Sequence, residues 1–447
     1  MQREQWASRL GFVLAAAGSA VGLGNIWRFP YVAGEQGGAA FIIIYLICIV
    51  LIGYPVMITE ISMGRATRKN PVGAFKALAP NTPWWLVGGL GVLTGFVILS
   101  YYSVVAGWAL HYMVEAITGF AEGIGVAEEA FIGHITGVAT PLFYHLIFMA
   151  LTTGIIAAGV VRGIQRVVEW LMPLLIVLVL ITIVRSVTLD GAMEGLAFML
   201  TPDFGAITAD TFLSAIGQSF FTLSLGMGAI ITYGSYLSNR DSVPNSAVQV
   251  IGFDTGIAIL AGFAIFPAVF AMGFEPGAGP GLVFITLPAV FAEMPAGALF
   301  GFVFFLLVSI GALTSAISLL EVCVAFVVDE YNWARKQAAL FMGFVIFLLG
   351  IPSILGYSVW ADFSFAGMDV LDTFDFFADS IFLPLGGVLT VIFAGHVWTT
   401  KNVLEEANTA SSGFTVGHWI APFLKYVIPI GVAIVMVVGI LETLGVL

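Results

Sequence analysis

The sequence predicts an all-α integral membrane protein with eleven transmembrane helices, arranged as a five-plus-five inverted repeat in which helices 1 and 6 are broken. Three observations carry this prediction. Hydrophobic residues make up 60% of the 447 residues and charged residues only 9%, whereas a single soluble core stops growing at about 250–300 residues. Apolar stretches of membrane-spanning length recur along the whole chain. Two of these stretches are interrupted by glycine-rich segments.

Eleven apolar stretches are long enough, at roughly twenty residues, to cross the hydrocarbon as helices, which satisfy their own backbone polar groups in lipid. They cover residues 10–29, 40–63, 86–112, 141–161, 167–187, 211–237, 243–272, 297–328, 338–355, 376–397 and 419–441. We expect one transmembrane domain over residues 1–447, with 10–187 as the first repeat, 211–397 as the second and 419–447 as an additional helix 11. The shorter apolar segment 281–294 predicts a re-entrant lid helix, with a surface-lying helix as the alternative.

The basic residues indicate the orientation of the chain, because Lys and Arg gather on the cytoplasmic side of a membrane. With a cytoplasmic N-terminus, the inside loops hold Arg65, Arg68, Lys69, Lys76, Arg162, Arg166, Arg240, Arg335, Lys336, Lys401 and Lys425. Only Arg28 and Arg185 fall at the other face, and an odd number of helices places the C-terminus outside. Residues 1–20 imitate a signal peptide, but we expect no cleavage, because a distinctive motif follows them. We expect a multi-pass protein of the cytoplasmic (inner) membrane.

The two interrupted stretches break at residues 18–25 and 222–228. They are the first and sixth spans. Successive spans cross the membrane in alternating directions, so spans five apart cross it in opposite directions and the two halves of the chain have inverted topology. At such breaks, helix N-termini and free N–H groups can face an anion, while free carbonyls can ligate a cation. The pattern predicts a site for a zwitterion and sodium. The alternative is that these glycines serve only close helix packing.

Four motifs, in order along the chain, resemble the signature of the neurotransmitter:sodium symporter family. They are WASRLGF at 6–12, GSAVGLGNIWRFP at 18–30, QSFFTLSLG at 218–226 and LTS at 313–315. The resemblance covers nearly the whole chain and is closest to the bacterial eleven-helix members that carry hydrophobic amino acids. It implies a sodium-coupled symporter that imports hydrophobic, branched and aromatic L-amino acids by alternating access.

The resemblance implies two sodium ions, each held by oxygen atoms, which suit a hard cation. The first site would use the Ala20 carbonyl, Asn25, Thr222, Asp254 and the substrate carboxylate. The second would use the carbonyls of Gly18, Val21 and Gly311 and the hydroxyls of Thr314 and Ser315. Because the substrate completes the first shell, sodium and amino acid would bind cooperatively.

The acids Glu60, Asp254 and Glu321 lie within predicted spans. An acid at the membrane centre costs about 2.5–3.5 kcal/mol on insertion scales, so each is a candidate functional group. By resemblance, Asp254 matches the first-sodium ligand and Glu60 matches an acid that hydrogen-bonds broken helix 6 as a structural anchor. Glu321 has no assigned role beyond a position facing the cytoplasmic vestibule.

Animal members of the family bind chloride beside the first sodium site. Tyr45, Gln218 and Thr222 resemble three of the chloride ligands, but Ala258 occupies the next ligand position. We therefore expect no chloride requirement and hypothesise that Asp254 supplies the negative charge, with a proton-linked return step as a further option.

The resemblance also implies a substrate pocket. Monoamine carriers have an aspartate where this chain has Gly22, so glycine leaves room for a substrate carboxylate to reach sodium. The implied pocket consists of Ala20, Gly22, Leu23, Gly24, Ile98, Tyr102, Phe221, Thr222, Ser224, Met227, Ser315 and Leu319. None of these residues is charged, so a charged substrate side chain would lose its hydration without a partner. Apolar side chains fit, and the flexible thioether of Met227 tolerates several shapes.

Two ion pairs match the family's gates. Arg28 with Asp375 would close the outer side, and Arg3 with Asp329 the inner side, with Trp6, Ser235 and Tyr236 packed beside the inner pair. Tyr102 and Phe221 would form a thin lid over the substrate. Gly163 and Pro173 resemble a motif that lets the fifth helix unwind towards the second sodium site, although a passive kink is the alternative.

Other function classes fit the sequence less well. An enzyme would need a nucleophile–base set or a metal cluster, but the histidines are scattered and no HExxH spacing occurs. A channel would need repeated filter loops or charged rings. No P-loop is present, so ATP is not the expected energy source. A non-transporting, sodium-dependent amino-acid sensor on the same scaffold remains an alternative. The expected partners are the amino-acid substrate, sodium and the lipid bilayer, with no nucleic acid. The sequence does not predict the oligomeric state.

Overall fold

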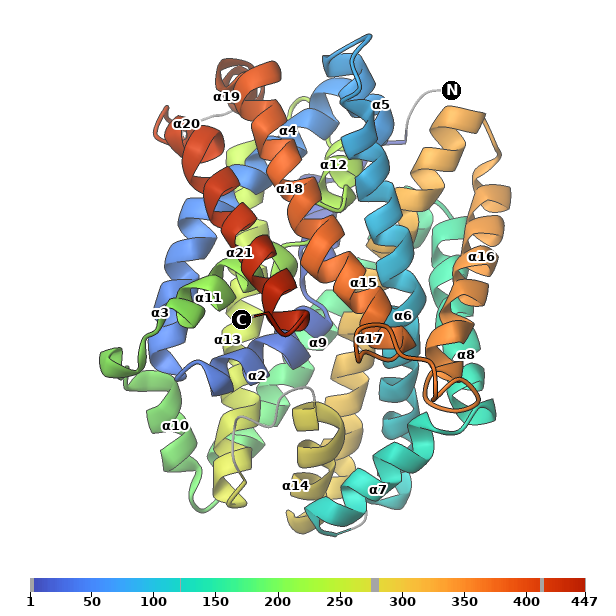
Figure 1. The fold of residues 1–447 in the computed structure, drawn as a ribbon, viewed down its shortest axis with the longest axis vertical. Helices are drawn as coiled ribbons and strands as arrows, with labels where there is room; N and C mark the ends of the chain where they lie inside the picture. Colours follow the sequence, from blue (N-terminus) through green and yellow to red (C-terminus); the bar gives the residue numbers. More distant parts are fainter. Residues whose placement is uncertain (1–3, 121, 275–280, 411–413, 447) are drawn as a thin grey trace.

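A computed structural model describes residues 4–120, 122–274, 281–410 and 414–446 of the chain. In these residues the secondary structure is helical, apart from one isolated bridge between Phe365 and Met368. The long helices run roughly along one axis (Figure 1). The prediction of an all-α membrane protein is therefore confirmed at the level of fold class.

The first half of the chain contains α1 (Arg9–Ala20), η1 (Gly24–Arg28), α2 (Phe29–Glu35), α3 (Ala39–Cys48), η2 (Ile49–Gly53), α4 (Tyr54–Thr67), α5 (Pro71–Leu78), α6 (Trp85–Thr118), α7 (Ile124–Ile135), α8 (Ala139–Ala157), η3 (Val160–Gln165), α9 (Arg166–Val187) and α10 (Ala192–Leu200). The second half contains η4 (Phe204–Ala206), α11 (Ala209–Thr222), α12 (Ala229–Gly234), α13 (Val243–Ala271), η5 (Leu282–Thr286), α14 (Leu287–Glu293), α15 (Gly297–Tyr331) and α16 (Arg335–Leu355). It ends with α17 (Val370–Asp375), η6 (Phe376–Phe382), α18 (Leu383–Ile392), η7 (Phe393–Val397), α19 (Thr400–Asn408), α20 (Ile420–Pro422), η8 (Phe423–Val427) and α21 (Ile428–Thr443). The η segments, except η4, are wider π-helical turns that mostly continue a neighbouring α-helix.

Nine helices of the described chain are long and apolar enough to span a membrane, and a tenth span is a bent pair. The bent pair is α1 with the segment Gly24–Glu35, which meet at 51°. The expected span 211–237 corresponds to α11 and α12, which residues 223–228 separate. Each of these two helices is too short to cross a bilayer alone. Nine to ten spans are thus found by length and composition, and the count of eleven stays a prediction.

Short helices cover both ends of the bundle. At one end lie α5 and α19, with the fully buried helix α12 inside the bundle near them, and at the other end lie α7, α10 and α14 (Figure 1). The chain's two longest helices, α6 and α15, pack along each other and form a central wall. The broken elements α1 and α12 lie against α15, so the breaks sit beside this wall.

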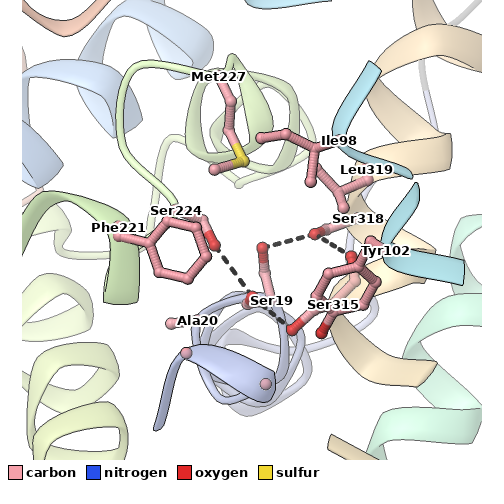
Figure 2. Close-up of a pocket in the computed structure, with 12 residues that line it drawn as sticks. Ser19, Ala20, Ile98, Tyr102, Phe221, Ser224, Met227, Ser315, Ser318 and Leu319 are labelled. Carbon is pink, nitrogen blue, oxygen red and sulfur yellow. Dashed lines mark hydrogen bonds between the residues drawn. The ribbon is translucent and has the colours of Figure 1, made fainter. Parts of the chain in front are cut away.

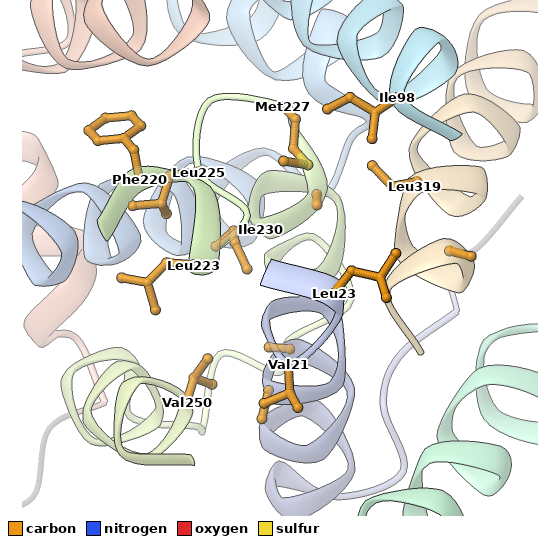
Figure 3. Packing of buried hydrophobic residues seen from close by; sticks show 14 of the residues in the cluster. Val21, Leu23, Ile98, Phe220, Leu223, Leu225, Met227, Ile230, Val250 and Leu319 are labelled. Carbon is orange, nitrogen blue, oxygen red and sulfur yellow. The ribbon is translucent and has the colours of Figure 1, made fainter. Parts of the chain in front are cut away.

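Apolar side chains fill the space around the two breaks (Figure 3). Val21 and Leu223, one from each break, are fully buried. Backbone also approaches backbone closely here. A Cβ atom added to Gly226 would lie 2.6 Å from the Leu383 carbonyl oxygen, and φ at Gly226 is +80°. Only glycine meets both conditions at low cost, which explains the glycine in this break.

The segment 281–294 forms the short apolar helix expected from its length, as η5 and α14. Phe284 packs edge-on against Trp108 of α6 and Trp27 of the first broken span. This contact places the segment over one end of the broken helix. Its entry into the membrane stays a prediction.

Candidate functional site

The first break begins where α1 ends at Ala20. Val21 leaves the helix with an extended backbone, and the chain turns before η1 begins at Gly24. The side chain of Asn25 holds this turn, because its Oδ1 accepts a hydrogen bond of 3.1 Å from the Gly22 amide. The break thus leaves polar backbone groups of a membrane span outside the hydrogen-bond pattern of a regular helix.

The second break follows the end of α11 at Thr222. Ser224, Gly226 and Gly228 adopt positive φ angles before α12 begins. Glu60 of α4 is fully buried, and its Oε1 accepts a hydrogen bond of 2.7 Å from the Gly226 amide. The contact expected between Glu60 and broken helix 6 is therefore present. The carboxylate compensates for an amide that the broken helix leaves without an intrahelical partner.

A cavity of about 30 Å³ lies between the two breaks. Its lining includes all residues of the predicted substrate pocket except Leu23 and Thr222. Figure 2 shows Ile98, Met227 and Leu319 on one side, with the polar groups of the first break opposite. This volume exceeds the roughly 10–15 Å³ that one ordered water molecule needs.

Two serines that the sequence analysis missed, Ser19 and Ser318, also line the cavity. Their hydroxyl groups form a hydrogen bond of 2.7 Å, and the Ser19 carbonyl accepts bonds from Ser224 and Ser315 at 3.0 Å (Figure 2). Ser318 lies three residues after Ser315, so the helical period puts both on one face of α15. That spacing was the signal in the sequence for Ser318.

Tyr102 of α6 reaches the first break, where its hydroxyl oxygen accepts a bond of 3.3 Å from the Leu23 amide. Gly22 lies beside it. A Cβ atom added to Gly22 would lie 2.2 Å from Ser315 Oγ and 2.9 Å from the Tyr102 hydroxyl oxygen. The absence of a side chain at Gly22 therefore keeps space open between these two hydroxyls.

Three of the predicted ligands of the first sodium site, namely Asn25, Thr222 and Asp254, form one buried cluster. Asp254 Oδ1 accepts hydrogen bonds from Asn25 Nδ2 at 2.7 Å and from Thr222 Oγ1 at 3.0 Å. Asp254 is fully buried, and its Oδ2 has no hydrogen-bond partner in the part of the chain that the structure describes. A buried carboxylate oxygen without a partner is costly. A bound cation or a proton would remove that cost.

The predicted ligands of the second sodium site also converge, between α1 and α15. Thr314 Oγ1 lies 3.3 Å from the Val21 carbonyl oxygen and 3.0 Å from that of Gly311. Ser315 Oγ lies 3.5 Å from the Gly18 carbonyl oxygen. Two hydroxyl groups of α15 thus lie close to carbonyl oxygens at the end of α1, and oxygen is the donor that a hard cation takes. The α9 helix passes beside this cluster, because a Cβ atom on Gly18 would lie 3.3 Å from Met172 Sδ.

The residues of the predicted fifth-helix motif lie in this neighbouring element. Gly163 is in the wide turn η3, and a Cβ atom there would lie 2.1 Å from the Ile155 carbonyl oxygen. Pro173 is inside α9. The unwinding of this helix stays a prediction.

A second cavity of about 320 Å³ lies next to the first, towards α7 and η5. Tyr102 and Phe221 line both cavities and so form the partition between them. Arg28 lies on the far side of this partition, with its guanidinium carbon 4.5 Å from the centre of the Phe221 ring.

The expected ion pair of Arg28 with Asp375 needs a correction. Arg28 pairs with Asp379 instead, at 2.8 Å. Asp375 accepts a hydrogen bond from Tyr101. The wide turn η6 (Phe376–Phe382) carries Asp379 and presents it to Arg28, and a turn of this type is not visible in residue types alone.

The other end of the site is closed by buried side chains. Glu321 of α15 is fully buried and forms a two-pronged ion pair with Arg335, whose Nη1 lies 2.9 Å from Glu321 Oε1. Tyr236 donates a hydrogen bond of 2.6 Å to the same carboxylate. Trp6 packs edge-on against Tyr236, as expected, and its Nε1 donates to the Tyr233 carbonyl. Glu321 therefore belongs to a closing network that the sequence analysis did not assign.

The predicted inner pair falls partly outside the described residues, because Arg3 is not among them. Asp329 lies at the end of α15, where its Oδ2 accepts a bond of 2.8 Å from the Asn70 amide. Ser235, expected nearby, is fully buried at the end of α12.

Comparisons with known proteins agree with this arrangement. The chain matches the sodium:neurotransmitter symporter family over residues 3–122 and 131–445. It is 41% identical over 443 residues to YhdH, an uncharacterised sodium-dependent transporter of Bacillus subtilis, with 98% of each chain covered. It is 38% identical over 450 residues to an uncharacterised sodium-dependent transporter of Haemophilus influenzae, again with 98% of each chain covered.

A solved structure shares the fold. The crystal structure of MhsT in complex with L-phenylalanine superposes with a TM-score of 0.89 at 48% identity, covering 98% of this chain and 100% of MhsT. This multi-pass membrane protein belongs to the sodium:neurotransmitter symporter family, a family of transporters rather than enzymes.

Proposed function

We propose that the protein is a sodium-coupled symporter that imports hydrophobic L-amino acids, both branched and aromatic, together with two sodium ions. The observation that carries the proposal is the position of one uncharged cavity between two broken helices whose breaks also hold buried oxygen clusters. A zwitterion needs polar partners for its carboxylate and ammonium groups, and the first break, Tyr102 and Ser224 offer them. Ile98, Met227 and Leu319 offer only apolar contact to the substrate side chain.

Coupling would follow from the shared position of the ligands. The substrate carboxylate would enter near Gly22 and complete the shell around the first sodium ion, so that each ligand raises the affinity for the other. Sodium at the second cluster would hold α1 against α15 through Thr314 and Ser315. Binding of both ions would thereby fix the broken helix in the closed arrangement.

Alternating access would use the two closed ends in turn. In the proposed orientation, the end with α5, α12 and α19 is cytoplasmic, because the basic loop residues gather there, and the C-terminus is outside. Arg28 with Asp379, above the Tyr102–Phe221 partition, would form the outer gate. The Glu321–Arg335–Tyr236 network, with the predicted pair of Arg3 and Asp329, would form the inner gate. An inverted repeat of 10–187 and 211–397 would give the two ends equivalent movements.

We also propose that transport does not require chloride. The unpartnered oxygen of Asp254 supports this, because a fixed carboxylate beside the first cluster can balance the sodium charge. Support also comes from MhsT, whose structure contains L-phenylalanine, an amino acid of the proposed substrate class.

The test is uptake of labelled leucine and tryptophan into proteoliposomes, with sodium or potassium outside and with chloride or gluconate as the anion. We expect uptake with sodium that is indifferent to chloride and is inhibited by other hydrophobic amino acids. Uptake that rises with chloride at constant sodium would overturn the role of Asp254. Sodium-dependent binding without uptake would identify a sensor and not a symporter.

A further inference from the structure

A third cavity lies on the outer surface of the bundle, away from the broken helices. It encloses about 430 Å³ between α5, α6 and α15. Most of its wall is apolar and includes Trp85, Leu93, Phe96 and Phe326. Leu93 and Trp85 are 44% and 43% exposed although they belong to a membrane-spanning helix. The groove therefore opens towards lipid.

The length of the groove matches one leaflet of a bilayer. Its lining runs along α6 from Trp85, the first residue of that helix, to Phe96. At 1.5 Å per residue these positions are about 16 Å apart along the helix axis. Half of a bilayer's hydrocarbon core is about 15 Å thick. A single acyl chain would run the length of the groove from the interface to the membrane centre.

Two side chains of opposite charge lie side by side at the end of the groove that is near the membrane interface. Lys76 of α5 and Glu330 of α15 both line the cavity, and Lys76 Nζ lies 2.6 Å from Glu330 Oε2. Lys76 Nζ also lies 5.9 Å from the centre of the Trp85 ring. Both side chains remain accessible, at 47% and 23%. A cation and an anion at the mouth of an apolar groove complement a headgroup that carries a phosphate and a free ammonium group.

We propose that this groove binds one phospholipid of the phosphatidylethanolamine class. Its phosphate contacts Lys76, its ammonium group contacts Glu330, and one acyl chain lies along α6 between α5 and α15. The apolar wall alone gives little preference over bulk lipid, because lipid tails are as apolar as the side chains. The selectivity therefore comes from the charged mouth. Trp85, at the level of the headgroups, is of the residue type that prefers this interface.

Gly89 offers a way to fill the groove without disturbing the fold. It lines the cavity, and a Cβ atom there would meet nothing within 4 Å. Gly89→Phe therefore places a ring in the groove. Gly154→Phe is the matched control, because Gly154 is exposed on α8, also has nothing within 4 Å of an added Cβ, and does not line this groove.

The experiment is a native mass-spectrometry titration of the delipidated full-length protein with phosphatidylethanolamine, phosphatidylcholine or phosphatidylglycerol. We expect one phosphatidylethanolamine to bind about fivefold more tightly than either other lipid, the size of effect that one charge contact near a membrane surface produces. Gly89→Phe should lose this preferred lipid and Gly154→Phe should keep it. Glu330→Gln should abolish the preference over phosphatidylcholine, which lacks ammonium N–H donors.

Two results would overturn the proposal. Equal binding of the three lipids by the unaltered protein would remove the headgroup selectivity. Unchanged phosphatidylethanolamine binding by Gly89→Phe would place the lipid elsewhere. Sodium-dependent amino-acid binding by each variant verifies that the variant is folded, because Gly89 and Gly154 lie outside the proposed transport site.

Discussion

Replacement of Gly22 by alanine tests the proposed substrate site with one methyl group. That methyl carbon would lie 2.2 Å from Ser315 Oγ and 2.9 Å from the Tyr102 hydroxyl oxygen. Ser315 would have to turn away from the Gly18 and Ser19 carbonyls, and Tyr102 away from the Leu23 amide. The substitution thus fills the space proposed for the substrate carboxylate and also disturbs a ligand of the second sodium site.

The expected loss follows from the cost of overpacking. Extra methyl groups in a packed site cost about 1–3 kcal/mol, which corresponds to about a fivefold to 150-fold loss of affinity. Equilibrium binding of labelled phenylalanine at several sodium concentrations measures this loss, and the sodium concentration for half-maximal binding should rise as well.

Gly95→Ala serves as the matched control. Gly95 lies on α6, and a Cβ atom there would be 3.6 Å from the Leu319 carbonyl oxygen, an ordinary contact. This variant should bind phenylalanine as the unaltered protein does. The reasoning is refuted if Gly22→Ala binds with unchanged affinity and unchanged sodium dependence while it remains folded.

Three further predictions follow from other parts of the structure. Asp254→Asn should raise the sodium concentration for half-maximal uptake about tenfold or more, since bonds to a charged group are worth about 1.5–3 kcal/mol, and uptake with unchanged sodium dependence would contradict the first sodium site. Arg335→Met should leave the buried Glu321 carboxylate without its ion-pair partner, at a cost of about 3–5 kcal/mol. A cysteine introduced near Tyr236 should then react faster with a labelling reagent added from the α5 end, and an unchanged labelling rate would exclude a closing role for the Glu321 network. Burial, and then the neighbouring His111, lower the pKa of His134 to about 3, so this group's contribution to stability is present above pH 6.5 and is lost as the pH falls towards 3. The thermal midpoint should therefore fall less steeply on acidification in His134→Gln, and parallel curves for the two proteins would exclude this contribution.

The sequence predicted the broken helices well, because each break has a local cause. Glycines at positive φ, such as Gly226 and Gly228, and a polar run within an apolar stretch are visible in the residues themselves. The helix pattern is visible for the same reason. The oxygen clusters needed more than local patterns, since Asn25 and Asp254 meet only through the folded chain. Their prediction depended on the resemblance to a family.

Some features that depend on helix register or distant pairing were not predicted. Arg28 pairs with Asp379 and not with Asp375, which lies four residues earlier in the chain. Arg65 is 1% exposed and pairs with Glu406 at 2.7 Å, across 341 residues of sequence, and no local pattern indicates such a pair. The shape of the substrate cavity depends on the rotamers of its side chains, which are set by packing and not by residue type.

Concentrative uptake in proteoliposomes tests the central claim most directly. An imposed inward sodium gradient with an inside-negative potential should accumulate labelled leucine above its outside concentration, because a zwitterion moving with sodium carries net positive charge. A potential of 100 mV supplies about 2.3 kcal/mol per charge, or about a fiftyfold accumulation for one net charge. A sodium ionophore should abolish the accumulation. Leucine that only equilibrates across the membrane, with no response to the sodium gradient or the potential, would contradict sodium-coupled symport.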